Sequence, residues 1–176
     1  MKKDFIIPIV VLAVICLFVS GALALMNSVT SPIIMQAAIE RARIARSDII
    51  PQADGFELVS ITDGMPKSVT EIYKTTNDTG YIFSITVIGY GGEIKFLCGI
   101  NNEGNVIKTA VLSQTETKGL GTPIFEEPYA GKFWGKNISG VESVDSISGA
   151  TITSNAFKFG IRDALTAFNI LNREGL

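Results

Sequence analysis

Hydroxyl side chains crowd around one glycine in the sequence DSISGATITSNAF, which runs from Asp145 to Phe157. The plainest interpretation is a helix start, because serine and threonine cap free backbone amides and Gly149 permits an unusual backbone angle. The alternative is a phosphate site, since a helix start offers unpaired amides and the positive end of a dipole. In that case Thr151 can be esterified to the phosphate, and the resulting diester keeps one negative charge.

The composition limits the chemistry that this chain can do alone. Its 176 residues include no histidine and two cysteines, Cys16 and Cys98, which lie far apart and form no CxxC pair. We therefore expect no catalytic histidine base, no zinc site and no cysteine-held iron–sulfur cluster, and we predict neither catalytic residues nor metal ligands. Without a base, Thr151 suits a modified acceptor better than a self-activated nucleophile. The formal charge of −2 gives no reason to expect nucleic acid, and redox chemistry would need an organic cofactor.

A second polar segment, SQTETKGLG, runs from Ser113 to Gly121. It follows a predicted strand and contains Gly119 and Gly121, which allow the backbone to approach a flat ligand closely. By itself this loop is a weak indication of a binding site.

The first structural element of the chain is an apolar run without charges, from Phe5 to Met26. Its length suits a helix that spans the membrane, and we predict an anchor at residues 1–26. The alternative is a cleaved signal peptide, but the run exceeds the usual ~7–15 residues of its apolar region. Lys2 and Lys3 favour a cytoplasmic N-terminus, which would put the rest of the chain outside the cytosol.

For residues 27–54 we predict a juxtamembrane helix and a linker. Ser31 would be the N-cap of this helix, Pro32 would occupy its first position, and Pro51 would end it. Residues 55–176 predict an α+β domain. Alternating apolar residues indicate an antiparallel meander, with Ile94, Phe96, Cys98 and Ile100 on one face. A final helix is expected from Thr153 or Ser154 to about Asn172, with those two hydroxyls as caps. Its apolar stripe would cover the sheet: Phe157, Ile161, Leu165, Phe168 and Leu171.

Together the two polar segments resemble a known family: the flavin-binding G subunit of the Rnf complex and the related C subunit of the sodium-pumping NADH:quinone reductase. The family pattern is Asp, two residues, Ser or Thr, then Gly-Ala-Thr, which appears here as Asp145, Ser148, Gly149, Ala150 and Thr151. The segment ETKGLG, Glu116 to Gly121, is similar to the family's Glu-Thr-Pro-Gly-Leu-Gly loop beside the flavin. The resemblance covers nearly the whole chain, and the short length favours the Rnf branch.

The resemblance implies an FMN attached to Thr151 through a phosphoester, by a separate flavin transferase that uses FAD. The phosphate would be held by Ser148, Gly149, Ala150 and Thr153, and the ring or ribityl chain by Glu116, Thr117, Leu120 and Gly121. Two residues depart from the family: Lys118 replaces a proline, and Gln114 replaces a common histidine. Loss of the proline is expected to loosen the loop. Lys118 is interpreted as a solvated charge, and the alternative is an inward lysine that stabilises an anionic reduced flavin.

The implied function is electron relay within a membrane-bound, ion-translocating ferredoxin:NAD+ oxidoreductase. The partners would be the other membrane subunits of the Rnf complex, the flavin transferase and membrane lipid, with no nucleic acid. The chain would lie in the cell membrane as a single span, with its FMN domain outside the cytosol. Three alternatives remain open: a stand-alone anchored flavin carrier, the quinone reductase C subunit, and a non-redox anchored scaffold.

Overall fold

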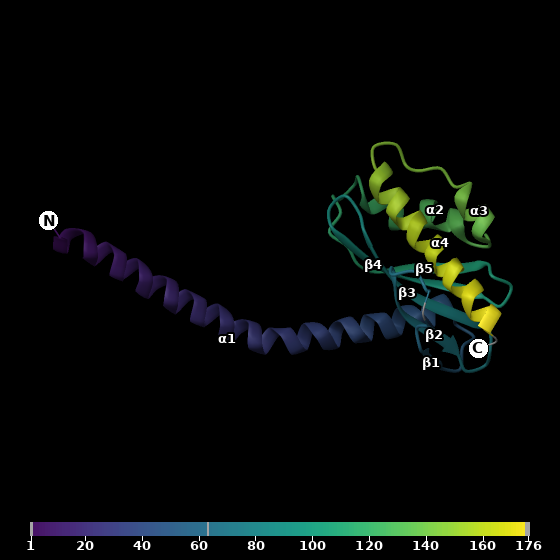
Figure 1. Cartoon of the computed structure of the whole chain (residues 1–176), viewed down its shortest axis with the longest axis horizontal. Helices are drawn as coiled ribbons and strands as arrows, with labels where there is room; N and C mark the ends of the chain where they lie inside the picture. The colour runs from purple at the N-terminus through teal and green to yellow at the C-terminus, as the bar shows by residue number, and fades with distance from the viewer. Residues whose placement is uncertain (1, 63, 175–176) are drawn as a thin grey trace. The chain divides into compact units, whose positions relative to one another are not determined.

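The computed structural model describes residues 2–62 and 64–174, and the chain divides into two units that meet between Arg41 and Ala42. The first unit consists of most of α1, a single helix that spans Lys2–Ile49 (Figure 1). In the described part of the chain, α1 is the one helix long and apolar enough to cross a membrane, and its most apolar stretch of 18 residues has a mean hydropathy of 2.9. The large apolar side chains from Ile6 to Met26 are exposed, as expected for the predicted anchor.

The prediction of a separate helix capped by Ser31 is wrong, because α1 runs through Ser31 and Pro32 without a break. No glycine or proline stands between Asn27 and Ser31, so nothing ends the helix before Pro32 is reached. A proline removes one backbone donor, and the remaining bonds of this long helix carry it past that point. The predicted stop before Pro51 is confirmed, since α1 ends at Ile49.

The second unit is built on a five-stranded antiparallel sheet. Its strands are β1 (Phe56–Val59), β2 (Val69–Thr75), β3 (Gly80–Ile88), β4 (Glu93–Asn101) and β5 (Val106–Ser113). Each strand pairs with the next along the chain, so the spatial order is β1-β2-β3-β4-β5. The predicted meander and the α+β class are confirmed, and β1 and β2 extend the sheet with residues before Gly80.

Four short helices separate the sheet from the final helix. They are η1 (Thr122–Phe125), α2 (Glu127–Ala130), η2 (Gly131–Phe133) and α3 (Ile138–Glu142). The final helix, α4 (Thr151–Glu174), lies across one face of the sheet (Figure 1). The five residues of its predicted stripe are all buried, and so are the four predicted inward residues of β4.

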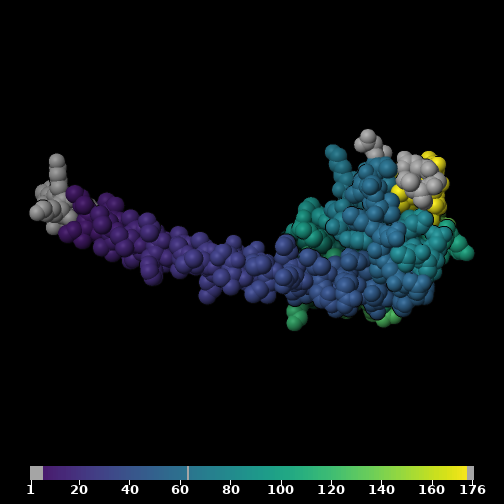
Figure 2. Space-filling model, turned by 90° about the horizontal axis from the view of Figure 1, so that it is seen from below, coloured from purple at the N-terminus to yellow at the C-terminus, as the bar shows by residue number. Residues whose placement is uncertain are grey.

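The other face of the sheet is covered by the end of α1. Ile49 and Ile50 are buried against Ile82 of β3 and Leu97 of β4. Gly99 permits this close packing, because a Cβ atom there would collide with the side chain of Ile49. Within the second unit, Figure 2 shows the dark-blue end of α1 lying directly against the blue and teal atoms of the sheet. The last turn of α1 is therefore part of this domain's core, whereas the predicted domain boundaries at residues 26 and 54 remain a prediction.

Cys98 is a core residue, as predicted. Its side chain is fully buried, and burial raises the pKa of the Cys98 thiol to about 12. The thiol is therefore protonated and unreactive at neutral pH.

Phe157 holds the centre of the core, with its ring centroid 4.7 Å from that of Phe96 and 5.7 Å from that of Phe133. Phe157→Ala should lower the free energy of unfolding by about 3–5 kcal/mol, because it leaves a cavity at a fully buried site. Chemical denaturation of the full chain in detergent measures this loss. Phe159→Ala is the matched control: its ring is 47% exposed on the same helix, and we expect a loss of about 1 kcal/mol or less. Equal losses in the two variants would contradict this account of the core.

Candidate functional site

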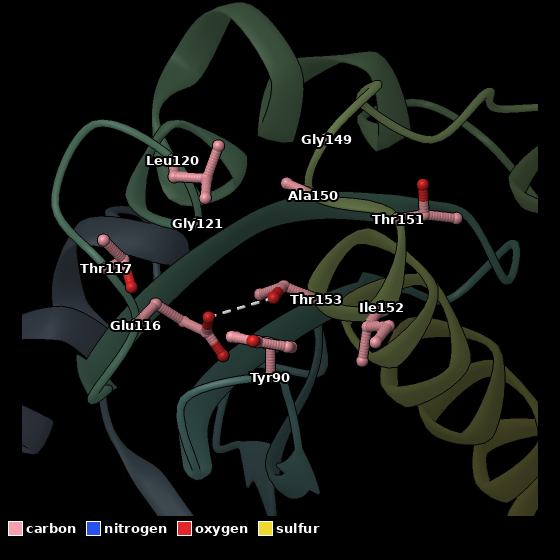
Figure 3. Close-up of a pocket in the computed structure, with 10 residues that line it drawn as sticks. All are labelled: Tyr90, Glu116, Thr117, Leu120, Gly121, Gly149, Ala150, Thr151, Ile152 and Thr153. Carbon is pink, nitrogen blue, oxygen red and sulfur yellow. Dashed lines mark hydrogen bonds between the residues drawn. The ribbon is translucent and has the colours of Figure 1, made fainter.

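A pocket of about 400 Å³ brings the two polar segments of the sequence together (Figure 3). Its walls come from the turn between β3 and β4, from the loop after β5 and from the first turn of α4. The residues that line it are Tyr90, Glu116, Thr117, Leu120, Gly121, Gly149, Ala150, Thr151, Ile152 and Thr153.

The antiparallel sheet explains why these distant segments meet. Ser113, at the end of β5, pairs with Lys95 near the start of β4, so the loop after β5 begins beside the β3–β4 turn. Thr115 fastens the two, because its Oγ1 donates a hydrogen bond of 2.9 Å to the carbonyl of Gly91. The start of α4 then closes the pocket from the helical side of the sheet.

Most of the predicted site residues line this one pocket, but Ser148 and Lys118 do not. Ser148 is exposed and does not line the pocket, contrary to the sequence expectation. Lys118 is also exposed and outside the lining, as the solvated interpretation of this residue expected.

Sequence reasoning missed Tyr90 and Ile152. Tyr90 is 73% exposed in a turn with three glycines, and an aromatic residue in such a turn was the available signal. Ile152 is 57% exposed, although apolar, and it stands between the two threonines of the motif.

The helix begins at Thr151, two residues earlier than the sequence indicated. Gly149 has a φ of +84°, as its predicted role in the turn requires, and the amide of Ser154 donates to the carbonyl of Ala150. Within the described residues, the amides of Thr151, Ile152 and Thr153 have no hydrogen-bond acceptor. The three residues with unpaired amides thus line the pocket, at the positive end of the helix dipole.

The prediction that Thr153 and Ser154 cap the helix is wrong. Thr153 is 1% exposed, and its hydroxyl donates a hydrogen bond of 3.0 Å to Oε2 of Glu116. Ser154 lies one residue further inside the helix, and its Oγ accepts a bond of 3.1 Å from the amide of Ile147. Both side chains hold other segments against α4, so their hydroxyls are not free for the helix amides.

Glu116 lies in one wall of the pocket and is hydrogen-bonded to the other two. Its Oε1 accepts a bond of 3.0 Å from the amide of Gly91, and its Oε2 accepts the bond from Thr153 (Figure 3). The side chain is 9% exposed, and in the described chain no lysine or arginine pairs with it. The carboxylate therefore links the β3–β4 turn, the loop after β5 and the first turn of α4.

Two glycines are needed because this carboxylate fills the space beside them. A Cβ atom on Gly89 would collide with the carboxylate, and one on Gly121 would lie 2.7 Å from Oε2. Gly89 and Gly121 are thus explained by the packing of Glu116.

The loop after β5 is held by its own hydrogen bonds. The carbonyl of Thr117 accepts bonds from the amides of Leu120 and Gly121, at 3.1 and 2.9 Å, and Gly119 has a φ of +79°. Gln114 shapes the start of the loop, because its Oε1 accepts a bond of 2.6 Å from the amide of Glu116. The loop therefore forms a tight turn that contains Lys118.

Thr151 is the accessible hydroxyl of the site. It is exposed, and its Oγ1 has no hydrogen bond among the described residues. Figure 3 shows its oxygen directed away from that of Thr153, on the opposite side of the pocket from Glu116 and Thr117. The described chain also contains no group of three side chains able to hold a metal ion. The arrangement suits the binding of a phosphate-bearing ligand.

Comparison with known proteins gives a consistent result. Residues 89–166 match the FMN-binding domain family, and this range includes every residue that lines the pocket. The chain is 30% identical to the G subunit of the ion-translocating oxidoreductase complex of Methanosarcina acetivorans, over 93% of this chain and 94% of that protein. It is 28% identical to the G subunit of the Na(+)-translocating ferredoxin:NAD(+) oxidoreductase complex of Acetobacterium woodii, over 93% and 91%. The proton-translocating counterpart from Clostridium ljungdahlii is 27% identical, over 84% and 83%.

Because Thr153 donates a buried hydrogen bond to Glu116, we expect it to contribute more to the free energy of unfolding than Thr151 does. Thr153→Val should lower the free energy of unfolding by about 1–3 kcal/mol, because it leaves a buried carboxylate oxygen without its donor. Thr153→Ser should keep most of the stability. Thr151→Val should change it by about 0.5 kcal/mol or less, because that side chain is exposed.

Denaturation of the flavin-free full chain compares these variants without interference from a ligand. If Thr151→Val and Thr153→Val lower the free energy of unfolding equally, the hydrogen bond from Thr153 to Glu116 does not contribute the predicted stability.

Proposed function

Because the chain belongs to the family of G subunits of ion-translocating oxidoreductase complexes, we propose that it carries one FMN on Thr151 and relays electrons in a membrane-bound ferredoxin:NAD+ oxidoreductase complex. The observation that carries this proposal is the exposed hydroxyl of Thr151 at the edge of the pocket, beside unpaired amides of α4. A phosphate esterified to that hydroxyl would lie next to donors that have no other partner in the described chain.

The first turn of α4 fits the phosphate of the cofactor. The phosphodiester would be bound by the amides of Ile152 and Thr153 and stabilised by the positive end of the helix. Gly149 and Ala150 add no bulk beyond a methyl group before Thr151, which leaves room for the transferase and the nucleotide. Thr153 would contribute its backbone amide only, because its hydroxyl is bonded to Glu116.

The remaining walls fit a flat ring system. The pocket of about 400 Å³ falls within the usual range of roughly 300–1,000 Å³ for small-molecule sites. Leu120 and Tyr90 offer apolar and aromatic surface, and both are exposed enough to be covered by a ligand. Close backbone approach is allowed at Gly149, where a Cβ atom would meet only the side chain of Leu120.

FMN would supply the redox chemistry, since a flavin accepts and donates one or two electrons. The residues of this chain would fix the position of the cofactor and limit the access of water to it. No side chain of the pocket needs to activate Thr151, because a separate flavin transferase would catalyse the attack of its hydroxyl on the FMN phosphorus of FAD, with AMP as the leaving group.

The membrane part of the proposal concerns α1. The apolar run within Phe5–Met26 would anchor the subunit in the cell membrane, next to lipid and to the other membrane subunits. Lys2 and Lys3 support a cytoplasmic N-terminus and an FMN domain outside the cytosol.

Substitution of the hydroxyls separates attachment from folding. Thr151→Ala should abolish the covalent adduct and the in-gel flavin fluorescence while the domain stays folded, since it truncates an exposed side chain. Thr153→Ala should keep the adduct, although it destabilises the domain. Tandem mass spectrometry of the flavin-bearing peptide from the wild-type chain, made with its transferase, locates the bond directly. An adduct that persists in Thr151→Ala, or that maps to Thr153, would refute the assignment.

The orientation is tested by cysteine labelling in intact cells. Asn102 is exposed in the turn between β4 and β5, so Asn102→Cys should react with a membrane-impermeant thiol reagent before lysis. The native Cys98 should stay silent because it is buried and its pKa is raised to about 12. Asn102→Ser gives the background, and lysed cells give the full signal. Labelling of Asn102→Cys only after lysis would place the domain in the cytosol instead.

A further inference from the structure

The charge inside the pocket differs from the charge at its rim. Glu116 is the only charged side chain among the ten residues that line it, whereas Lys118 lies outside the lining and is exposed. The two donors to the carboxylate, the amide of Gly91 and the hydroxyl of Thr153, are both neutral. In the described chain its negative charge therefore has no ion-pair partner.

We propose that Glu116 lowers the reduction potential of the flavin bound in this pocket. The inference rests on the proposed function, because it requires a cofactor in the pocket. One-electron reduction transfers an electron from the donor of the complex to the flavin and, without proton uptake, adds one negative charge. A carboxylate in the wall of the same pocket repels that charge, so the reduced form is destabilised relative to the oxidised form.

Burial of the carboxylate strengthens this repulsion. Like charges interact weakly when both are in water and more strongly in a partly desolvated pocket. Glu116 is 9% exposed, and apolar or uncharged residues form the rest of the lining. The carboxylate is also immobilised, because bonds to two different segments and the packing of Gly89 and Gly121 prevent it from turning away.

A structural role and an electrostatic role of Glu116 predict opposite results for two variants. Glu116→Gln keeps the size of the side chain and can keep both contacts, since its amide oxygen can accept from Gly91 while its NH₂ donates to Thr153. It removes the charge. Glu116→Asp keeps the charge but is too short to keep both hydrogen bonds.

The experiment is a potentiometric titration of the full chain with its covalent flavin, in detergent, with an electrode and soluble mediators. Glu116→Gln should raise the ratio of reduced to oxidised flavin at a fixed potential by about tenfold, which corresponds to about 59 mV for one electron. Glu116→Asp should remain near the wild-type potential while its thermal stability falls. Glu57→Gln, an exposed glutamate on β1, and Lys118→Gln are the matched controls and should shift the potential much less.

Several outcomes would overturn the inference. An unchanged or lower potential in Glu116→Gln excludes the electrostatic effect. A shift in Glu116→Asp with none in Glu116→Gln assigns a purely structural role to the side chain. If Glu116→Gln does not fold, Glu116→Asp decides: a wild-type potential supports the charge effect, and a shifted one contradicts it.

Denaturing gels distinguish failure of this inference from failure of the proposed function. A wild-type chain without in-gel flavin fluorescence, made with its transferase, would refute both. A fluorescent wild-type chain whose potential does not depend on the charge of Glu116 would refute only the inference.

Discussion

The hydrogen bond between Thr153 and Glu116 joins the first turn of α4 to the loop after β5, and these are two of the three walls of the pocket. The same carboxylate accepts the amide of Gly91, so the β3–β4 turn is fixed to the same point. A buried carboxylate is costly unless it is hydrogen-bonded, which makes the position of Glu116 sensitive to the loss of either donor. The unpaired amides of α4 are held in place relative to the loops by this arrangement.

The two threonines of the motif differ in their surroundings. Thr153 is turned inward and stabilises the fold, whereas Thr151, two residues earlier, is turned outward with a hydroxyl that has no partner in the described chain. Successive positions on a helix point in different directions, so two residues of the same type meet different neighbours. Of these two, the outward threonine alone leaves its hydroxyl available for a covalent bond to a cofactor.

The two faces of the sheet pack against different helices. One face lies under α4 and supports the pocket, while the other buries Ile49 and Ile50 at the end of α1. The end of α1 is thereby built into the domain that forms the site. Gly99 permits this packing on one face of β4, while Phe96 and Cys98 fill the core on the other.

Local periodicity and composition were sufficient to predict the apolar N-terminal helix, the meander and the stripe of the last helix. The two polar segments also identified most of the pocket lining. Long-range contacts, in contrast, set the start of α4, the bond from Thr153 to Glu116 and the place of Tyr90 in the wall. These features depend on residues far apart in the chain, and no local pattern encodes which hydroxyl meets which carboxylate. The continuous course of α1 through Ser31 and Pro32 likewise overrode a local start signal, since a long helix keeps its other bonds when one donor is lost.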